Sequence, residues 1–356
     1  MKRVTKAILI AVAGVAVLAV IAGGYLWYSM GQPLYEPGMV RAARNLRAPL
    51  KPPAQPADEQ FWQMEEDIRL CHFSAGAGRN VLVIHGGPGY PYAKPWTGLE
   101  SLTQSYRFHY YDQRGSGQST RPIVTFTSQN YYENLTTLDR TLGLGAQIAD
   151  IERIRQILGD DELILVGHSF GGFLAALYAA EFPEHVDALV LAAPADMLVM
   201  PPPSGGLFEQ VRERLPEDMQ AEYDAYLKRY LDFQSIFGKS EADLTALNEA
   251  FSRYYQAALP AAAFPAGGRA GGWMVQAMYF SMGQRHDYRA ALKAVTAPVL
   301  VVHGAGDLQP ETASRMYAEV FPNARFEVIA NATHFPFEEQ PTAFETIVGE
   351  FLASLR

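Results

Sequence analysis

The segment at residues 163–182 restricts the possible folds of this chain more than any other part. It begins with the apolar run Leu-Ile-Leu-Val at 163–166, continues through Gly-His-Ser-Phe-Gly at 167–171, and ends in an apolar stretch with helical spacing. A short apolar run bounded by glycine indicates a buried strand, and small flanking residues let the chain fold back tightly. The segment therefore predicts a strand, a sharp turn and a helix, with the hydroxyl group of Ser169 exposed at the turn.

Strands and helices alternate along the rest of the chain. Such alternation predicts an α/β fold with a mainly parallel sheet that is covered by helices on both faces. The expected elements are a hairpin-like opening over 61–73, buried strands at 81–84, 107–111, 163–166, 188–192, 299–302 and 325–329, and helices at 147–158, 173–182, 311–320 and 342–355.

One region interrupts this alternation. Residues 196–289 contain no convincing buried strand and instead show helical patterns separated by proline and glycine. We expect an inserted helical cap here, between a first core part at 58–195 and a second at 290–356. The alternative is that these helices are long crossovers that cover the sheet. The expected cap helices are 207–215, 217–233, 241–258 and 273–282.

Composition excludes several classes of function. The formal net charge is -9 and no run of lysine or arginine is present, which argues against a nucleic-acid partner. The single cysteine, Cys71, cannot form an intrachain disulfide, and we expect it to be packed rather than nucleophilic. No cluster of cysteine and histidine has metal-ligand spacing. We therefore expect no metal ion.

The N-terminal residues predict a membrane segment. Residues 7–28 carry no charge, and a helix of this length rises about 33 Å, enough to cross a bilayer core of about 30 Å. Basic residues precede the run and aromatic residues close it, so we expect a single-pass anchor within 1–30 with a cytoplasmic N-terminus and an extracytoplasmic catalytic domain. The alternative is a signal peptide cleaved near 20–22, which leaves a secreted protein. Residues 31–57 form a proline-rich connector, expected to act as a spacer.

The residues after two late strands supply partners for Ser169. A serine hydroxyl group is a weak nucleophile and needs a base, and a turn of this kind places serine, acid and histidine in that chain order. Asp307 follows the strand at 299–302 through a glycine-rich turn, and His334 lies in the loop after the next strand. We expect Asp307 to orient His334, and His334 to act as the general base. Poorer alternatives, expected to be structural or solvated, are His185, His286, His303 and, for the acid, Asp287.

Two backbone N–H groups are candidates for an oxyanion hole, which needs preorganised donors. One belongs to Phe170, directly after the serine. The other is expected at Gly87, in the sequence His-Gly-Gly-Pro-Gly at 85–89 that follows an apolar strand. Glycines allow these N–H groups to approach a substrate closely. His85 is expected to organise the loop.

Taken together, four motifs resemble one branch of the α/β-hydrolases. They are His-Gly-Gly-Pro-Gly at 85–89, Asp-Gln-Arg-Gly-Ser-Gly-Gln-Ser at 112–119, Gly-His-Ser-Phe-Gly at 167–171, and the Asp307/His334 pair. The combination resembles the peptidases called proline iminopeptidases over about 60–195 and 290–356. The resemblance implies an α/β-hydrolase fold with a helical cap, the three triad roles, and an acyl-enzyme mechanism without a cofactor. It also implies that Asp112 and Arg114 organise the loop behind the active site.

The chain departs from that family at the turn and in the cap. The family usually has Gly-Gly-Ser-Trp-Gly at the turn, whereas His168 and Phe170 flank the serine here. Those peptidases hold the free amine of the substrate with cap glutamates, one of them in an Asn-Glu-Phe segment, but the corresponding residues 279–286 contain no glutamate. Glu241 and Glu249 lie in the cap on faces expected to be solvated.

Three interpretations follow from these departures. The first is an aminopeptidase that removes N-terminal proline or small apolar residues from short peptides or small molecules. The second is an esterase or amide hydrolase with an apolar pocket. The third, a non-enzymatic binding module, conflicts with the complete triad and the glycine-rich loop.

Overall fold

The computed structural model describes residues 31–203, 205–259 and 262–355. The predicted anchor or signal segment at 1–30 lies outside these residues. Among the described helices, none is both long and apolar enough to cross a membrane.

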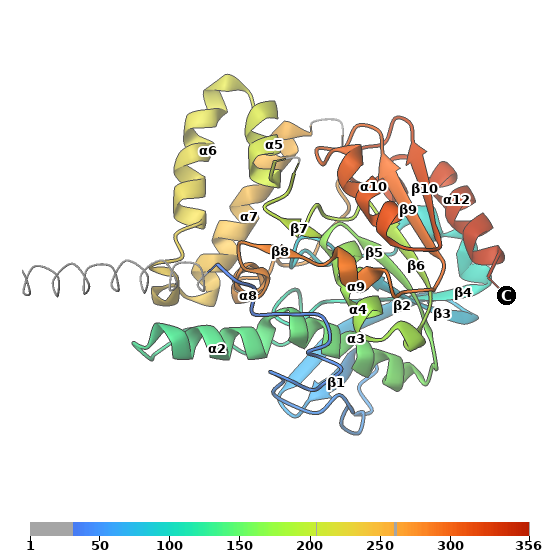
Figure 1. Ribbon diagram of the computed structural model, residues 1–356, viewed down its shortest axis with the longest axis horizontal. Coiled ribbons are helices and arrows are strands. Elements are labelled where there is room, and N and C mark those ends of the chain that lie inside the picture. The colour runs from blue at the N-terminus through green and yellow to red at the C-terminus, as the bar shows by residue number, and fades with distance from the viewer. Residues whose placement is uncertain (1–30, 204, 260–261, 356) are drawn as a thin grey trace, which may run out of the picture.

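An eight-stranded sheet forms the centre of the protein (Figure 1). The strand order is β1-β2-β4-β3-β5-β6-β9-β10, with β1 and β2 antiparallel at one edge and parallel pairing from β4 to β10. The predicted mainly parallel α/β sheet is confirmed. The strands are β1 Phe61–Glu65, β2 Ile68–Gly76, β3 Arg79–Ile84, β4 Tyr106–Tyr111, β5 Leu163–His168, β6 Val186–Ala192, β9 Val299–Gly304 and β10 Ala324–Ile329.

Side chains along the central strands alternate between two apolar layers. On β3, Leu82 and Ile84 join one layer, and Val81 and Val83 join the other. Successive residues of a strand point to opposite faces, so a strand buried on both faces reads as a continuous apolar run. The first layer contains α3 Leu144–Leu158, α4 Phe170–Glu181, α9 Arg289–Leu292 and α10 Glu311–Val320, and the second contains α11 Pro336–Glu339 and α12 Pro341–Ala353.

The insertion at 196–289 divides into two parts by its packing. Helices α5 Leu207–Arg214, α6 Glu217–Tyr230 and α7 Glu241–Ala258 enclose a separate apolar cluster rich in tyrosine. Helix α8, Trp273–Met282, instead joins the main core through Trp273, Met274 and Met278.

A two-residue antiparallel ladder joins the two ends of the insertion. It pairs β7 Val199–Met200 with β8 His286–Asp287. Two paired residues leave no apolar run in the sequence, and this is why no strand is predicted there.

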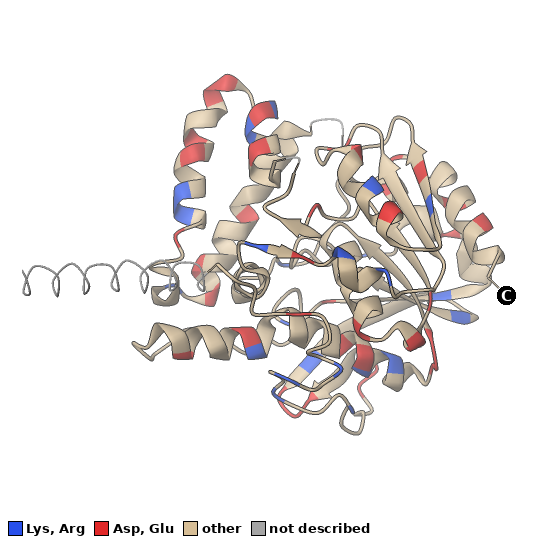
Figure 2. Ribbon diagram, in the orientation of Figure 1, with Lys and Arg blue, Asp and Glu red and all other residues tan. Residues whose placement is uncertain are grey.

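Helix α2, Tyr131–Leu142, is absent from the predicted elements. Its sequence is mostly polar, and it begins at a local signal, the Asn130 side chain, which accepts hydrogen bonds from the N–H groups of Tyr132 and Glu133. Figure 1 shows α2 running beside the core below α8. Figure 2 shows that charges of both signs lie on α6, with the acidic residues toward one end and the basic residues toward the other. That helix has acidic residues in its first turn and basic residues in its last, which suits the helix dipole.

The connector differs from the expected spacer. Its first part packs on the core, with Val40 fully buried. The buried carboxylate of Glu181 accepts hydrogen bonds from the Tyr35 hydroxyl group (2.9 Å), from Gly38 N (2.8 Å) and from Arg41 N (3.0 Å). A buried carboxylate needs such donors, and these contacts attach the segment to the end of α4 rather than leaving it free.

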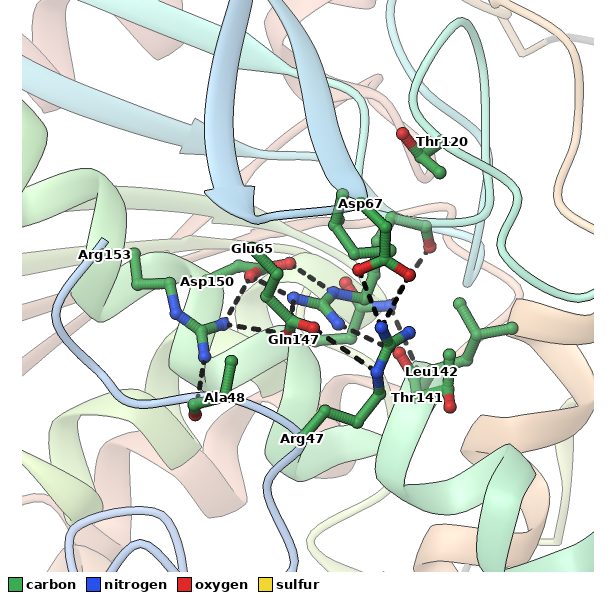
Figure 3. A network of polar contacts seen from close by, with 12 residues as sticks. Arg47, Ala48, Glu65, Asp67, Thr120, Thr141, Leu142, Gln147, Asp150 and Arg153 are labelled. Carbon is green, nitrogen blue, oxygen red and sulfur yellow. Dashed lines mark hydrogen bonds and ion pairs between the residues drawn. The ribbon is translucent and has the colours of Figure 1, made fainter. Parts of the chain in front are cut away.

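A buried cluster of charges ties the opening hairpin to α3 (Figure 3). Arg114 is fully buried and donates to Asp150 from Nε (2.6 Å) and from Nη2 (2.5 Å), and to Glu65 from Nη2 (2.8 Å). Arg153 also donates to Asp150 (3.0 Å). Burial alone lowers the pKa of Arg114, but the carboxylates of Asp150 and Glu65 outweigh it and raise that pKa above its usual value. The arginine therefore stays charged.

Replacing Arg114 tests this cluster. Arg114→Leu leaves Asp150 and Glu65 as buried charges with a major partner removed, so we expect the free energy of unfolding to fall by about 3–5 kcal/mol. Urea denaturation measures the change. Arg315→Ala, which breaks an exposed ion pair with Glu311, is the control and should cost no more than about 1 kcal/mol. Equal losses in the two variants would contradict the assigned importance of the cluster.

Candidate active site

Ser169 occupies a strained position between β5 and α4. Its φ is 53° and its ψ is -121°, a conformation that non-glycine residues rarely adopt. The Ser169 N–H group donates to Ala192 O (3.0 Å), and its carbonyl accepts from Gly172 N (2.9 Å). A Cβ atom at Gly171 would clash with the carbonyl of Ile84. The predicted sharp turn is present, and the missing side chain at Gly171 allows it. Ser169 itself is buried rather than exposed as expected.

Asp307 and His334 lie together, as the sequence predicts. Asp307 Oδ2 lies 2.8 Å from His334 Nδ1, and both side chains are buried. Asp307 follows β9, and its other carboxylate oxygen accepts from Gln309 N (3.1 Å). A carboxylate can only accept at this position, so Nδ1 carries a proton, and in the neutral form of the ring Nε2 presents a lone pair. That tautomer is the one a general base needs.

The loop that carries His334 is fixed beside the turn. The carbonyl of His334 lies 2.8 Å from His168 Nε2, and the two rings have centroids 4.7 Å apart. Glu339 holds the preceding residue, because it accepts from both Thr333 N and the Thr333 hydroxyl group, and it also accepts from Ala263 N (3.1 Å) in the cap. Sequence reasoning missed Glu339, because nothing in the local pattern distinguishes it from a solvated glutamate.

The glycine-rich loop also reaches the turn. A Cβ atom at Gly86 would lie 2.9 Å from Ser169 Cβ, and Gly87 follows at a φ of 119°, which favours glycine. Phe170 is the first residue of α4. Within the described part of the chain, neither Gly87 N nor Phe170 N donates to a backbone carbonyl. Both expected donors are therefore free of main-chain partners.

His85 organises this loop, as expected. Gln113 N donates to His85 Nε2 (3.0 Å), and the Gln113 side chain donates to His85 O (2.9 Å). Burial lowers the pKa of His85 to about 4, so the ring is neutral and can accept at Nε2. Asp112 and Arg114 do not pair with each other: Asp112 accepts from Gln118 N (2.7 Å), and Arg114 belongs to the buried cluster.

The rival candidates have other partners. His303 contacts the Ser314 hydroxyl group (3.0 Å), and Asp287 pairs with the exposed Arg289. The ring of His286 contacts the carbonyl oxygens of Met197 and Met282, and His185 pairs with Glu152. Among the described residues, no group of acidic, histidine and cysteine side chains could hold a metal ion.

The cap glutamates differ from each other. Glu241 is buried, pairs with Arg121, and accepts from Trp273 N (2.6 Å) at the start of α8. The expectation that it is solvated is wrong, because it caps a helix that begins inside the protein. Glu249 is exposed, as expected.

Aromatic side chains form the contact between the cap and the core near His334. Tyr255 lies edge-on to the ring of His334, with centroids 5.9 Å apart, and Phe264 contacts Phe335 at 5.0 Å. The Tyr255 hydroxyl group is buried without a hydrogen-bond partner among the described residues.

The family model for the alpha/beta hydrolase fold matches residues 79–341, and this range contains all the site residues above. The chain belongs to the α/β-hydrolase family. This α/β-hydrolase resembles the proline iminopeptidases in particular.

Two of the relatives with that name illustrate the match. The proline iminopeptidase of Heyndrickxia coagulans is 27% identical over 291 residues, which are 79% of this chain and 92% of that protein. The proline iminopeptidase of Saccharolobus solfataricus is 23% identical over 300 residues, or 78% and 86% of the two chains.

Solved structures show the same fold at lower identity. A thermophilic esterase from Thermogutta terrifontis matches with a TM-score of 0.54 and 22% identity, covering 85% of this chain and 99% of the esterase. The proline iminopeptidase of Mycobacterium smegmatis matches with a TM-score of 0.53 and 18% identity, covering 81% and 95%. The family model and the proline iminopeptidase relatives show that this α/β-hydrolase is an enzyme, and the solved structures add the shared fold.

Proposed function

We propose that this α/β-hydrolase is a serine hydrolase that cleaves a small ester or amide through an acyl-enzyme on Ser169. The observation that carries the proposal is the strained Ser169, held between β5 and α4 beside the loop of the Asp307–His334 pair. A non-glycine residue in such a conformation costs about 1–3 kcal/mol, a cost expected at a functional site rather than at an ordinary turn.

The residues divide the reaction between them. Ser169 Oγ attacks the substrate carbonyl while His334 Nε2 takes its proton, and Asp307 stabilises the imidazolium that forms. The N–H groups of Gly87 and Phe170 hold the oxyanion. His334 then protonates the leaving group, and water, activated by the same histidine, hydrolyses the acyl-enzyme.

Removing the nucleophile tests the mechanism. We expect Ser169→Ala to lose turnover of a p-nitrophenyl ester by several orders of magnitude while remaining folded, since the rest of the turn is unchanged. A fluorophosphonate probe should label the wild-type protein at Ser169. Ser105→Ala, at an exposed serine, is the control and should keep full activity. Labelling at another residue, or turnover by the Ser169 variant, would disprove the assignment.

Two substrate classes fit this chemistry. The names of the relatives, proline iminopeptidases, favour N-terminal prolyl amides or similar short peptides. A second class, substrates without a free amine, is favoured by the cap: Glu241 is committed to Arg121 and the start of α8, and Glu249 is exposed. A free ammonium group that enters a pocket without a paired carboxylate loses hydration without compensation.

The cap charges predict how a free amine affects the rate. We expect an N-acetylated proline arylamide to be hydrolysed at least as fast as the free-amine form, and a short-chain aryl ester faster than either. Comparing kcat/KM for the three substrates measures this. A strong preference for the free amine that disappears in Glu249→Gln would contradict the expectation. It would favour an iminopeptidase that binds the amine of the substrate through Glu249.

We propose in addition that residues 7–28 anchor the enzyme in a membrane and place the catalytic domain outside the cytoplasm. The support is the length, hydropathy and flanking charges of this run. We expect the full chain in the membrane fraction, and a reporter fused after residue 60 to be active only outside the cytoplasm. Recovery of a soluble protein that begins near residue 23 would favour signal cleavage instead.

A further inference from the structure

Two side chains that the proposed mechanism does not use connect the active-site loops. The Tyr92 hydroxyl group lies 2.6 Å from His168 Nδ1, and His168 Nε2 lies 2.8 Å from the carbonyl of His334. A carbonyl oxygen only accepts, so Nε2 must carry a proton, and Nδ1 of a neutral ring must accept from Tyr92. The two contacts fit together only in this one tautomer.

The surroundings keep His168 neutral. Its ring is packed among Trp96, Phe335 and Phe337, with centroids 5.1 to 6.1 Å away. Burial lowers the pKa of His168 well below its usual value, and the neighbouring rings of His334 and His85 add to this, against the opposing effect of the His334 carbonyl. A protonated ring would also turn the Tyr92 contact into one between two donors, unless the hydroxyl group rotated.

The loop that carries Tyr92 is paired with the cap. Ala93 N donates to Ala266 O (2.9 Å), Gly268 N donates to Pro91 O (2.8 Å), and Gly271 N donates to Gly89 O (2.9 Å). These hydrogen bonds lie on both sides of Tyr92, so the position of its hydroxyl group depends on the docked cap loop at 266–271.

The same loop begins at the glycines of the expected oxyanion hole. A Cβ atom at Gly86 would lie 3.1 Å from His168 Nδ1. His168 is therefore the point at which the glycine-rich loop, the cap-bound Tyr92 and the main chain of His334 meet.

From these contacts we infer that Tyr92 and His168 are positioning residues. They link the cap loop at 266–271 to the main chain of the general base, His334. The inference rests on the proposed function, because it concerns the alignment of His334 with Ser169. Neither side chain is assigned a contact with the reacting atoms. When Tyr92 is held by the cap, His168 is fixed in one tautomer and holds the His334 carbonyl, so that the imidazole stays in line between Asp307 and the serine.

Tyr92→Phe removes the hydroxyl group and keeps the ring that packs on Trp96 and Phe337. The matched control is Tyr111→Phe, because the buried Tyr111 hydroxyl group has no hydrogen-bond partner among the described residues. For each protein we would measure the rate constant of fluorophosphonate labelling, the fraction of protein labelled at completion, and kcat and KM for p-nitrophenyl acetate.

We expect Tyr92→Phe to lower the labelling rate constant and kcat by about tenfold to a hundredfold, as small misplacements in active sites do. The labelled fraction should stay complete and KM should change by less than about twofold, because ground-state binding is untouched. The Tyr111 variant should match the wild-type protein. Rate constants equal to the control, or a reduced labelled fraction with an unchanged rate constant, would overturn the inference, since a merely structural role changes only the amount of active protein.

A second measurement does not depend on activity. In Ser169→Ala protein, ¹⁵N NMR of the His168 ring should show the neutral Nε2–H tautomer between about pH 5 and 8, where an unperturbed histidine titrates. A proton on Nδ1 in that range would overturn the inference even if Tyr92→Phe fails to fold. Absence of labelling at Ser169 in the wild-type protein, with this tautomer intact, would instead refute the proposed function and leave the contact standing.

Discussion

The positive φ angle at Ser169 is the constraint on which the rest of the site depends. β5 ends and α4 begins on either side of this one residue. The turn is possible because two glycines lack side chains: a Cβ atom at Gly167 would clash with Gly171, and one at Gly171 would clash with the carbonyl of Ile84. Hydrogen bonds to Ala192 and Gly172 fix this geometry from both sides. The strain is maintained by the surrounding sheet and helix, which would have to move together to relieve it.

Buried polar contacts fix the positions of the active-site loops, which the turn at Ser169 alone does not fix. The Arg114 cluster fixes the loop that follows β4, and Gln113 in that loop holds His85 at the start of the glycine-rich loop. On the other side, Glu339 holds the residue before His334. The contacts of Arg114 and Gln113 join segments that are distant in sequence, so the loops that carry them are positioned by the folded core rather than by their own local preferences.

The cap affects the site through similar contacts. Its tyrosine-rich cluster at α5–α7 is separate from the main core, whereas α8 packs within that core. Glu241 looks like a candidate amine ligand in the sequence, but it caps α8 in the fold. The part of the insertion at α8 thus belongs to the main core and the part at α5–α7 has its own apolar cluster. The loop between α7 and α8 is paired with the loop that carries Tyr92.

The sequence by itself determined the sheet strands, the sharp turn and the Asp307–His334 pair, because apolar runs and glycine-bounded turns are local signals that report burial and backbone conformation directly. It could not give α2, whose helix is mostly polar, nor the packing of the segment around Val40, nor the separation of Arg114 from Asp112. Only the tertiary structure decided these, and it also made His168 a contact of His334. The physical reason is that a buried polar group takes whichever partner the fold brings near, and that partner often lies more than a hundred residues away in the chain.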